Sequence, residues 1–327
     1  MSLTENQMVE TITKIMDGQS TDAEIERFLT DLAARGETTE EITGAARVLR
    51  AKAETIQSPP GTIDCCGTGG DMTGTYNIST AVALVAAACG VPVAKHGNRA
   101  STSKSGAADV LEKLGVNLNL SKASLEAALK EMNFAFLMAP NHHKAMKNVS
   151  AVRKKLGTKT IFNLLGPLAN PAGTKLQLVG VYDKKWLQPM AEALRNLGST
   201  RAWVVHGSDG LDEITVTGPT QIAILDNGKI EQKEITPADF GLPVSKAEGL
   251  KGGDAAINAD ALQKLLNGEK SAYRDITIAN TAAVLCIHGT AKNLKDGAQR
   301  AAKAIDDGLA RKTLQDYIAF SQNHGES

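Results

Sequence analysis

A glycine-rich loop between two apolar runs constrains the fold of this chain more than any other feature. The loop, residues 67–80, carries four glycines, an aspartate and several hydroxyl side chains, and it follows the short apolar run of residues 63–66. Glycines lack a Cβ atom, so their backbone N–H groups can approach an anion closely. Ser79 and Thr80 precede the small, apolar residues 81–89, where the cap and the positive end of a helix favour phosphate. The pattern therefore predicts a strand, a phosphate-binding loop and a helix.

This loop differs from two common nucleotide-binding motifs. No lysine follows its glycines, as G-x-x-x-x-G-K-[ST] requires, and its glycine spacing differs from G-x-G-x-x-G. Both an ATPase loop and a dinucleotide-binding fingerprint are therefore disfavoured. On this stretch alone, a glycine-rich surface turn before a helix is the alternative interpretation.

A second polar loop follows the next apolar run. Residues 95–99, Lys-His-Gly-Asn-Arg, close the buried-strand pattern of residues 91–94, and the hydroxyl-rich residues 100–106 lead into a helix pattern over residues 109–115 that ends in glycine. Taken alone, this loop could be a solvated turn with ordinary surface charges. Because ligands of open α/β sheets bind at the carboxyl ends of strands, two such loops in succession favour a phosphate site.

The chain divides into a helical N-terminal part and a longer α/β part. Apolar residues recur at helical spacing in residues 5–16, 22–34 and 39–55, whereas short apolar runs alternate with helix patterns beyond residue 57. A helical patch over residues 141–165 interrupts this alternation. The predicted fold class is α/β, with a small all-helical domain and a larger domain built on a central, mostly parallel sheet flanked by helices. The candidate strands are residues 63–66, 91–95, 134–138, 176–182, 202–206 and 221–225.

Composition excludes several classes of function. The 36 basic and 36 acidic side chains give a net charge of zero, which argues against nucleic acid or membrane surfaces as partners. The sequence shows no positively charged leader ahead of an apolar segment. No apolar run approaches the length of a membrane span, which is about 20 residues, so we expect a cytoplasmic protein. The four cysteines, two of them adjacent at Cys65 and Cys66, match neither a disulfide framework nor a zinc site.

Two adjacent carboxylates form a third polar cluster. Asp212 and Glu213 end the polar loop that begins at residue 206, after a candidate strand. Such oxygen ligands suit Mg²⁺, which is often shared between carboxylates and substrate phosphates. By themselves, adjacent loop carboxylates are more often solvated surface charges, and that alternative stays open at this point.

In this order and spacing, the motifs resemble the anthranilate phosphoribosyltransferase family nearly from end to end. Each motif alone is weak evidence, whereas the whole series is specific. The resemblance rests on residues 67–71, 77–80, 95–100, 105–115, 145–147, 152–153, 156–157, 160–171 (Thr-Ile-Phe-Asn-Leu-Leu-Gly-Pro-Leu-Ala-Asn-Pro) and 210–213 (Gly-Leu-Asp-Glu).

The resemblance implies that the helical patch packs with the N-terminal helices. The small domain would then comprise residues 1–60 with about 141–166, and the large domain residues 61–140 with about 167–327. Hinges would lie at residues 58–61 and near Pro140 and Pro167. The resemblance also implies a homodimer through the helical domain, and an anthranilate synthase amidotransferase is a candidate partner.

The implied activity is transfer of the phosphoribosyl group of phosphoribosyl pyrophosphate to the amine of anthranilate, the second step of tryptophan synthesis. No catalytic acid or base is required, because pyrophosphate leaves from C1 of the ribose as the amine attacks with inversion. The leaving group would be stabilised by Lys95, by backbone donors and by Mg²⁺, with two ions per subunit expected.

The family pattern assigns three groups of binding residues to this chain. Arg153 suits the carboxylate of anthranilate, because a planar guanidinium makes two parallel hydrogen bonds, but without the resemblance it would be interpreted as part of a basic helix face. His96 and His143 would lie near the site, with a structural role favoured for each. The implied anthranilate ligands are Gly67, Asn98 and Arg153, and the implied metal ligands are Ser79, Asp212 and Glu213. The implied phosphoribosyl pyrophosphate ligands are Gly67, Gly70, Asp71, Thr75, Asn77, Ile78, Ser79, Thr80, Lys95, His96, Gly97, Asn98, Arg99, Ala100, Ser101, Thr102, Ser103 and Ala107.

Two departures from the family pattern are visible. Ala107 stands where the family usually has the second serine of Ser-Gly-Ser-Ala-Asp, which removes one hydroxyl from the phosphoribosyl site. A neutral hydrogen bond contributes about 0.5 to 1.5 kcal/mol, so we expect weaker binding at most. Residues 141–144, Asn-His-His-Lys, differ from the usual histidine-proline, which leaves the role of His143 open.

Two related functions are the alternatives. A pyrimidine nucleoside phosphorylase shares this architecture but uses free phosphate and a nucleobase. Asp212, Glu213 and Arg153 argue against it, because they match a metal and a carboxylate. A non-enzymatic branch of the fold binds nucleic acid and should be strongly basic, whereas this chain is neutral.

Overall fold

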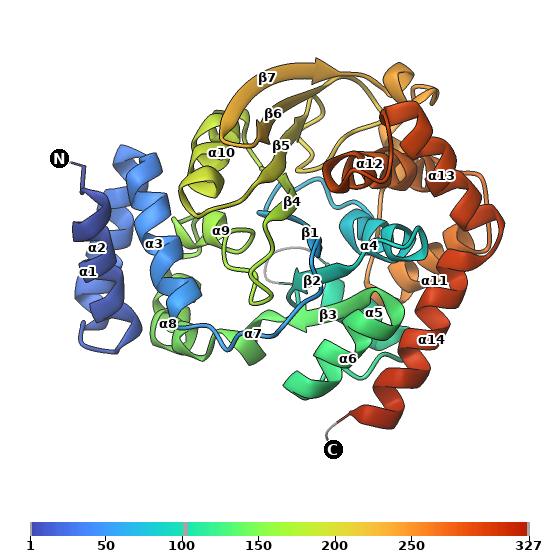
Figure 1. The fold of residues 1–327 in the computed structure, drawn as a ribbon. Coiled ribbons are helices and arrows are strands. Elements are labelled where there is room, and N and C mark those ends of the chain that lie inside the picture. Colours follow the sequence, from blue (N-terminus) through green and yellow to red (C-terminus); the bar gives the residue numbers. More distant parts are fainter. Residues whose placement is uncertain (1, 101–103, 326–327) are drawn as a thin grey trace.

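A seven-stranded sheet forms the centre of the fold. The computed structural model describes residues 2–100 and 104–325, and within them the strand order is β3-β2-β1-β4-β5-β6-β7 (Figure 1). Strands β1 to β5 run parallel, whereas β6 and β7 are antiparallel to their neighbours. The predicted α/β fold with a mostly parallel sheet is confirmed. The strands are β1 Ile63–Gly67, β2 Val93–Gly97, β3 Phe134–Met138, β4 Leu176–Gly180, β5 Arg201–Gly207, β6 Thr220–Asp226 and β7 Lys229–Ile235.

The six predicted strands are present, and β7 is an addition that the apolar patterns do not predict. Its sequence is mostly polar and exposed, as is common for a strand at the edge of a sheet. A local signal does exist, because Asn227 and Gly228 connect β6 to β7 with φ values of 47° and 86°. An Asn-Gly pair in this conformation is typical of a two-residue hairpin turn.

The three N-terminal helices each begin at a capping box. A threonine hydroxyl accepts the backbone N–H three residues later, and the glutamine or glutamate at that position bonds back to the threonine N–H. The predicted helices are confirmed, except that the third ends at Ala51 instead of Thr55. They are α1 Glu5–Met16, α2 Asp22–Arg35 and α3 Thr39–Ala51, capped by Thr4, Thr21 and Thr38.

Helices cover both faces of the sheet. On one face α4, α12 and α14 pack together, and their apolar side chains form a core with β1, β2 and β3. On the other face α10 packs against β5 and β6. The helices beyond α3 are α4 Ile78–Ala88, α5 Ala107–Lys113, α6 Lys122–Met132, α7 Ala139–His142, α8 Lys147–Leu156, α9 Phe162–Leu165, α10 Leu187–Asn196, α11 Ala255–Leu266, α12 Ala272–His288, α13 Leu294–Asp306 and α14 Leu309–His324, with short 3₁₀ turns at Lys144–Met146, Lys184–Trp186, Pro237–Phe240 and Ala247–Leu250.

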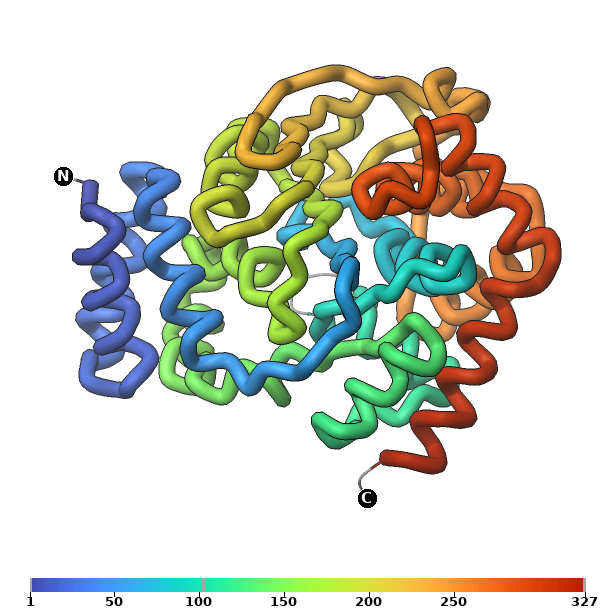
Figure 2. The backbone as a smooth tube through the Cα atoms, viewed as in Figure 1, coloured from blue at the N-terminus to red at the C-terminus, as the bar shows by residue number. Residues whose placement is uncertain are grey.

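Helices from two separate parts of the chain lie together beside the sheet. α8 contacts α1 and α2, and α9 contacts α3, although β1 to β3 separate them in sequence (Figure 1). Figure 2 follows the connection from α3 to β1 along residues 52–62. The apolar side chains of these helices form a second core, which also includes Val179, Val204 and Ala223 of the sheet. The division of the chain into two domains stays a prediction.

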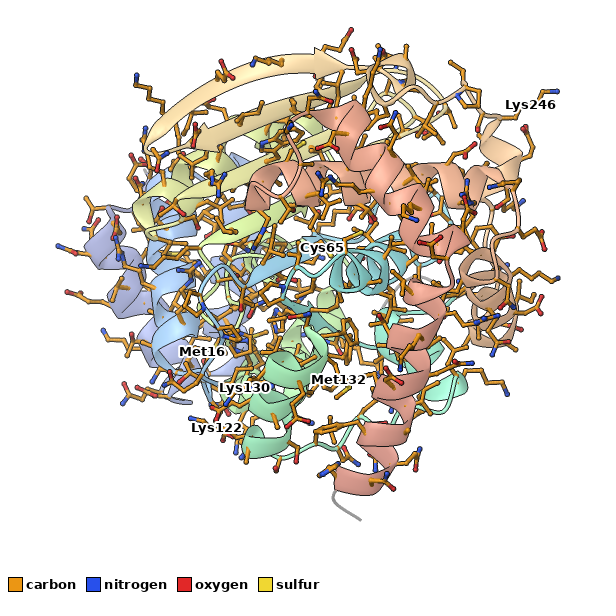
Figure 3. The ribbon with its side chains drawn as sticks, turned by 45° about the vertical axis from the view of Figure 1, so that its right-hand side comes forward. Met16, Cys65, Lys122, Lys130, Met132 and Lys246 are labelled. Carbon is orange, nitrogen blue, oxygen red and sulfur yellow. The ribbon has the colours of Figure 1, made fainter. Side chains whose placement is uncertain are left out.

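Burial separates interior from surface in the expected way. Cys65 is 1% exposed and lies deep in the molecule, whereas Lys246 projects from its surface (Figure 3). The four cysteines are free thiols. None of the helices in residues 2–100 and 104–325 combines the length and hydropathy that a membrane crossing requires.

The strand order creates a switch point beside β1, where the connections leave toward opposite sides of the sheet. From β1 the chain proceeds to β2 and β3 on one side, and then returns to add β4 on the other side of β1. In open α/β sheets, ligands bind at the carboxyl ends of the strands beside such a switch point. The glycine-rich loop leaves β1 at this position, so the fold places it where a ligand site is expected.

Replacing Gly44 should loosen the packing of the N-terminal helices. A Cβ atom at Gly44 of α3 would lie 2.6 Å from the Glu5 carbonyl oxygen and 3.0 Å from the Met8 Cβ atom of α1. For Gly44→Val we expect the free energy of unfolding in urea to fall by about 1 to 3 kcal/mol, because the helices must move apart. Ala51→Val, at the exposed end of the same helix, is the control and should cost no more than about 0.7 kcal/mol. Equal losses for both variants would contradict this packing.

Candidate functional site

The Asp212–Glu213 loop packs directly on the glycine-rich loop. The backbone N–H of Gly69 donates a hydrogen bond to Oδ2 of Asp212 over 2.7 Å. Gly67 and Gly180 are paired at the ends of β1 and β4, and a Cβ atom at either position would overlap Asp212. Two glycines are therefore needed for this contact. The tertiary structure brings together two polar clusters that lie far apart in the sequence.

Three carboxyl groups, those of Asp71, Asp212 and Glu213, lie close to one another beside the glycine-rich loop. Burial and the nearby Asp71 raise the pKa of Asp212 above its usual range. Burial and Asp212 raise the pKa of Glu213 well above its usual value, while Lys95 and a hydrogen bond from the Ser79 backbone oppose this shift. Within the described residues no cluster of three or more His, Cys, Asp or Glu side chains could hold a metal by itself. The raised pKa values mean that burial disfavours the charged forms of Asp212 and Glu213, and a divalent cation would stabilise these charged forms, provided that other oxygens complete its coordination.

Further contacts hold the middle of the glycine-rich loop. Asp71 accepts hydrogen bonds from the backbone N–H of Thr73 over 3.3 Å and from its hydroxyl over 2.6 Å. Thr75 pairs with Lys251 in an isolated bridge. Gly69 and Gly70 have φ values of 68° and 74°, a left-handed conformation that favours glycine. The loop therefore has a defined path between β1 and α4.

Helix α4 begins before the predicted cap residues. Asn77 is the N-cap and Ile78 is the first helical residue, so the prediction that Ser79 and Thr80 cap the helix is wrong. Asn77 is fixed in this position because its Oδ1 accepts a hydrogen bond from Asn258 over 2.8 Å and its Nδ2 donates to a carbonyl of the second loop over 3.2 Å. Thr80 is 0% exposed, and its hydroxyl has no partner among the described residues. A buried hydroxyl is thus available at the N-terminus of α4.

Strand β2 extends beyond the predicted strand 91–95, so His96, expected in the second loop, lies inside it together with Lys95. Lys95 and His96 are 2% and 6% exposed, and the loop begins at Asn98. Burial disfavours the charge of Lys95, but the neighbouring thiols and the carboxylates of Asp64 and Glu213 raise its pKa overall. The backbone N–H of His96 donates to Oδ1 of Asp64 over 3.2 Å. Lys95 therefore lies in a buried network of charges behind the loops.

Asp109 organises the second loop, a role that sequence analysis missed. One oxygen of its carboxylate accepts hydrogen bonds from the backbone N–H groups of Ala100 and Gly106, over 2.9 and 2.8 Å. Arg99 pairs with Asp109 and makes two parallel hydrogen bonds to Glu112, each over 2.8 Å. The capping-box spacing between Gly106 and Asp109 is the local signal for this role.

A cavity of about 590 Å³ opens beside the two loops and extends to helices α7, α8 and α9. Eight of the implied ligands line it: Gly67, Gly70, His96, Gly97, Asn98, Arg99, Ala100 and Arg153. Others do not line it, namely Asp71, Thr75, Asn77, Ile78, Ser79, Thr80, Lys95, Ala107, Asp212 and Glu213, and Ser101, Thr102 and Ser103 lie outside the described residues. The cavity and the carboxylates thus flank the glycine-rich loop.

Arg153 of α8 and Phe162 of α9 form part of the wall of this cavity. The guanidinium carbon of Arg153 lies 5.4 Å from the centre of the Phe162 ring. Burial lowers the pKa of Arg153, although an arginine remains charged at neutral pH. An aromatic ring beside a cation suits a planar, anionic ligand.

Two histidines that line this cavity contact each other. The rings of His96 and His143 have centres 5.2 Å apart. Nδ1 of His96 lies 3.2 Å from the carbonyl oxygen of Gly166, so Nδ1 carries the proton. Burial and His143 lower the pKa of His96 to about 3, so its ring is neutral. The Nε2 atoms of both rings lack partners among the described residues.

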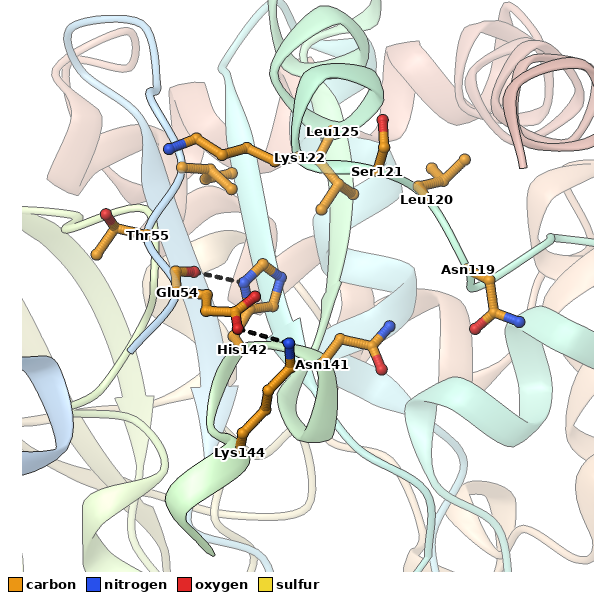
Figure 4. Close-up of a pocket in the computed structure, with 11 residues that line it drawn as sticks. Glu54, Thr55, Asn119, Leu120, Ser121, Lys122, Leu125, Asn141, His142 and Lys144 are labelled. Carbon is orange, nitrogen blue, oxygen red and sulfur yellow. Dashed lines mark hydrogen bonds and ion pairs between the residues drawn. The ribbon is translucent and has the colours of Figure 1, made fainter. Parts of the chain in front are cut away.

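A second cavity of about 460 Å³ contains none of the implied ligands (Figure 4). His142 faces it, with Nδ1 donating to the Glu54 carbonyl over 2.7 Å, and Lys144 pairs with the Glu54 carboxylate over 2.6 Å. The adjacent histidines His142 and His143 therefore face different cavities, and His143 is the one beside the candidate site.

Comparison with family models places most of the chain in one family. Residues 59–311 match the model described as "Glycosyl transferase family, a/b domain", and residues 1–53 match "Glycosyl transferase family, helical bundle domain". The chain is 58% identical over 306 residues to the anthranilate phosphoribosyltransferase of Rhodospirillum rubrum. The aligned region covers 94% of this chain and 88% of that protein.

Two solved structures share the whole fold. The crystal structure of anthranilate phosphoribosyltransferase from Thermus thermophilus is 40% identical, covers 98% of this chain and 97% of its own, and has a TM-score of 0.94. Anthranilate phosphoribosyltransferase from Saccharomyces cerevisiae in complex with PRPP and Mg is 28% identical, covers 98% and 94%, and has a TM-score of 0.89.

Removing the Asp109 carboxylate should loosen the second loop. For Asp109→Ala we expect the amides of Ala100 and Gly106 to exchange hydrogen for deuterium about tenfold faster, because both lose their acceptor. Glu112→Ala is the matched control, since it removes a partner of Arg99 without touching either amide. The same exchange rates in both variants would assign the order of this loop to other contacts.

Proposed function

The chain belongs to the anthranilate phosphoribosyltransferase family, and from this premise we propose how its site works. It transfers the phosphoribosyl group of phosphoribosyl pyrophosphate to the amine of anthranilate, giving N-(5-phosphoribosyl)anthranilate and pyrophosphate in the second step of tryptophan synthesis. The observation that carries the site proposal is the packing of Asp212 on the glycine-rich loop, with the Arg153 cavity beside it. A fluorescence assay of anthranilate consumption, with and without phosphoribosyl pyrophosphate and Mg²⁺, tests the activity.

The relatives favour this activity over the two alternatives. The similar proteins bear the name anthranilate phosphoribosyltransferase, and the chain covers most of their length. A pyrimidine nucleoside phosphorylase would have no use for a carboxylate-binding arginine such as Arg153. A nucleic-acid-binding relative should be basic, whereas this chain has a net charge of zero.

The glycine-rich loop and the start of α4 suit the phosphates of phosphoribosyl pyrophosphate. Backbone N–H groups, the positive helix end and the unpartnered hydroxyl of Thr80 can all donate to phosphate oxygens. Asn98 and the loop after it, which follow β2, would contribute further contacts to the phosphates. Ala107 begins α5 and offers no hydroxyl, so the expected small loss of affinity stays a prediction.

Ser79, Asp212 and Glu213 would hold Mg²⁺. Their oxygens fit a hard cation, and the raised pKa values of both carboxylates, caused first by burial, support a missing counter-charge. When bound, the metal would neutralise charge that develops on the pyrophosphate leaving group. A second ion per subunit would need Asp71 or substrate oxygens, and it remains part of the proposal.

Catalysis would rest on charge and position, with no residue acting as acid or base. Lys95 is buried beside Glu213, so it would stabilise the leaving group through this network of charges without lining the cavity. Arg153 would bind the carboxylate of anthranilate against the Phe162 ring, and Gly67 and Asn98 line the same cavity. The amine would then face the ribose in a space that the loops shield from water.

The larger organisation also stays a proposal. Residues 1–60 with about 141–166 would form a small domain that closes on the large one about residues 58–61, Pro140 and Pro167. A homodimer, an anthranilate synthase amidotransferase partner and a cytoplasmic location are predictions. Size-exclusion chromatography with light scattering would test the dimer.

Removing the metal or its ligand should abolish turnover. We expect EDTA to eliminate the activity and Glu213→Gln to lower kcat at least a hundredfold, because the leaving group loses its counter-charge. The affinity for anthranilate, measured by fluorescence titration, should change little. Full activity in the presence of EDTA would contradict the assignment of these residues to a metal site.

Removing the guanidinium of Arg153 should impair anthranilate specifically. A charge-assisted bidentate pair contributes about 1.5 to 3 kcal/mol, so Arg153→Ala should lower kcat/KM for anthranilate about tenfold to a hundredfold. Arg153→Lys should recover only part of this loss, because an ammonium lacks the fork. Lys154→Ala, the exposed neighbour on α8, is the control. If Arg153→Ala leaves the anthranilate kinetics unchanged, Arg153 is only part of a basic helix face and does not bind anthranilate.

A further inference from the structure

An exposed lysine lies beside the glycine-rich loop, and among the residues that the structure describes it forms no ion pair. Lys159 belongs to the short connection between α8 and α9. A Cβ atom placed on Gly70 would lie 3.2 Å from Cε of Lys159, so the side chain reaches the turn of the loop. The sequence motifs single out Arg153 in this region but not Lys159.

An aromatic ring fixes the position of this ammonium. Nζ of Lys159 lies 3.6 Å from the centre of the Tyr182 ring, close enough for a cation–π contact. The backbone N–H of Tyr182 donates to the hydroxyl of Thr68 over 3.1 Å, and the N–H of Thr68 donates to the carbonyl of Gly180 over 2.9 Å. Tyr182 is therefore tied to the loop itself, and the lysine is held in register with the loop.

The charges around Lys159 are attractive but do not satisfy its donors. Asp71, Asp183 and Asp212 attract the ammonium and Lys185 repels it, and within residues 2–100 and 104–325 no hydrogen bond joins any of the three carboxylates to it. An ammonium has three N–H donors, and the π face of one ring satisfies none of them as well as an oxygen does. A cation with free donors beside backbone N–H groups is an arrangement that binds anions.

We propose that Lys159 binds the phosphate oxygens of phosphoribosyl pyrophosphate at the turn of the glycine-rich loop. This inference rests on the proposed function, because it needs that substrate at this loop. Arg153, Phe162 and Lys159 belong to one segment of the chain, so one segment would contact both substrates: anthranilate through Arg153 and phosphate through Lys159. The competing role is electrostatic screening, in which Lys159 only reduces repulsion between Asp71 and Asp212.

Calorimetric titration with phosphoribosyl pyrophosphate in Mg²⁺ distinguishes the two roles. Lys159→Gln keeps a polar side chain without the charge, and it should weaken binding of phosphoribosyl pyrophosphate about tenfold. Lys159→Arg should restore most of the affinity, because phosphate accepts from either cation. Lys154→Gln removes an exposed charge from the same segment without reaching the loop, and it should bind like the unmodified chain. The KM for anthranilate should stay unchanged in all three variants. If Lys159 only supported the structure of the site, its replacement would raise this KM as well.

Two results would overturn the proposal in different ways. If Lys159→Gln binds phosphoribosyl pyrophosphate as tightly as the unmodified chain but binds Mg²⁺ alone more tightly, Lys159 only screens the carboxylates. If the unmodified chain itself fails to bind phosphoribosyl pyrophosphate, the proposed function fails and the inference fails with it. A tenfold loss in Lys159→Gln with recovery in Lys159→Arg supports direct contact.

Discussion

The contact between Asp212 and the glycine-rich end of β1 determines the geometry of the whole site. It requires the absence of a Cβ atom on both Gly67 and Gly180, which face each other at the ends of neighbouring parallel strands. The N–H of Gly69 then binds the carboxylate directly. Because this donor belongs to a loop suited to phosphate, carboxylates and phosphate are expected to share one small region. Carboxylates and phosphates repel each other, so the proposed site needs positive charge between them, from a metal ion or from cationic side chains.

Buried charges behind the loops give this region its rigidity. Lys95 on β2 and Asp64 on β1 are 2% and 0% exposed, and the backbone of His96 bonds to the same aspartate. Charges in a protein interior persist only where partners and hydrogen bonds offset the loss of water. The network joins the ends of β1 and β2 to Glu213. Lys95, which the predicted strand 91–95 already includes, is in this way part of the framework behind the loops.

The opposite wall has a different character, because it comes from short helices and their connections. Arg153, Phe162 and Lys159 all belong to the segment from α8 to α9, which packs against α1 to α3. The apolar core of these helices continues into the sheet through Val179 and Val204. Any movement of this wall would therefore have to keep that core packed, for example by a small rotation about the proposed hinges at residues 58–61, Pro140 and Pro167. Cationic groups on this wall would favour the proposed closure when an anionic substrate is present.

The sequence by itself determined the elements whose causes are local. Capping boxes set the starts of the N-terminal helices, and glycines set the turn after β1. These signals act within a few residues, so no long-range contact is needed to recognise them. Tertiary structure alone decided that β1 and β4 are neighbours, that Asn77 starts α4 through a bond to Asn258, and that Lys95 is buried. Each of these depends on segments distant in sequence, whose approach is set by strand order and packing, and a local pattern carries no information about that approach.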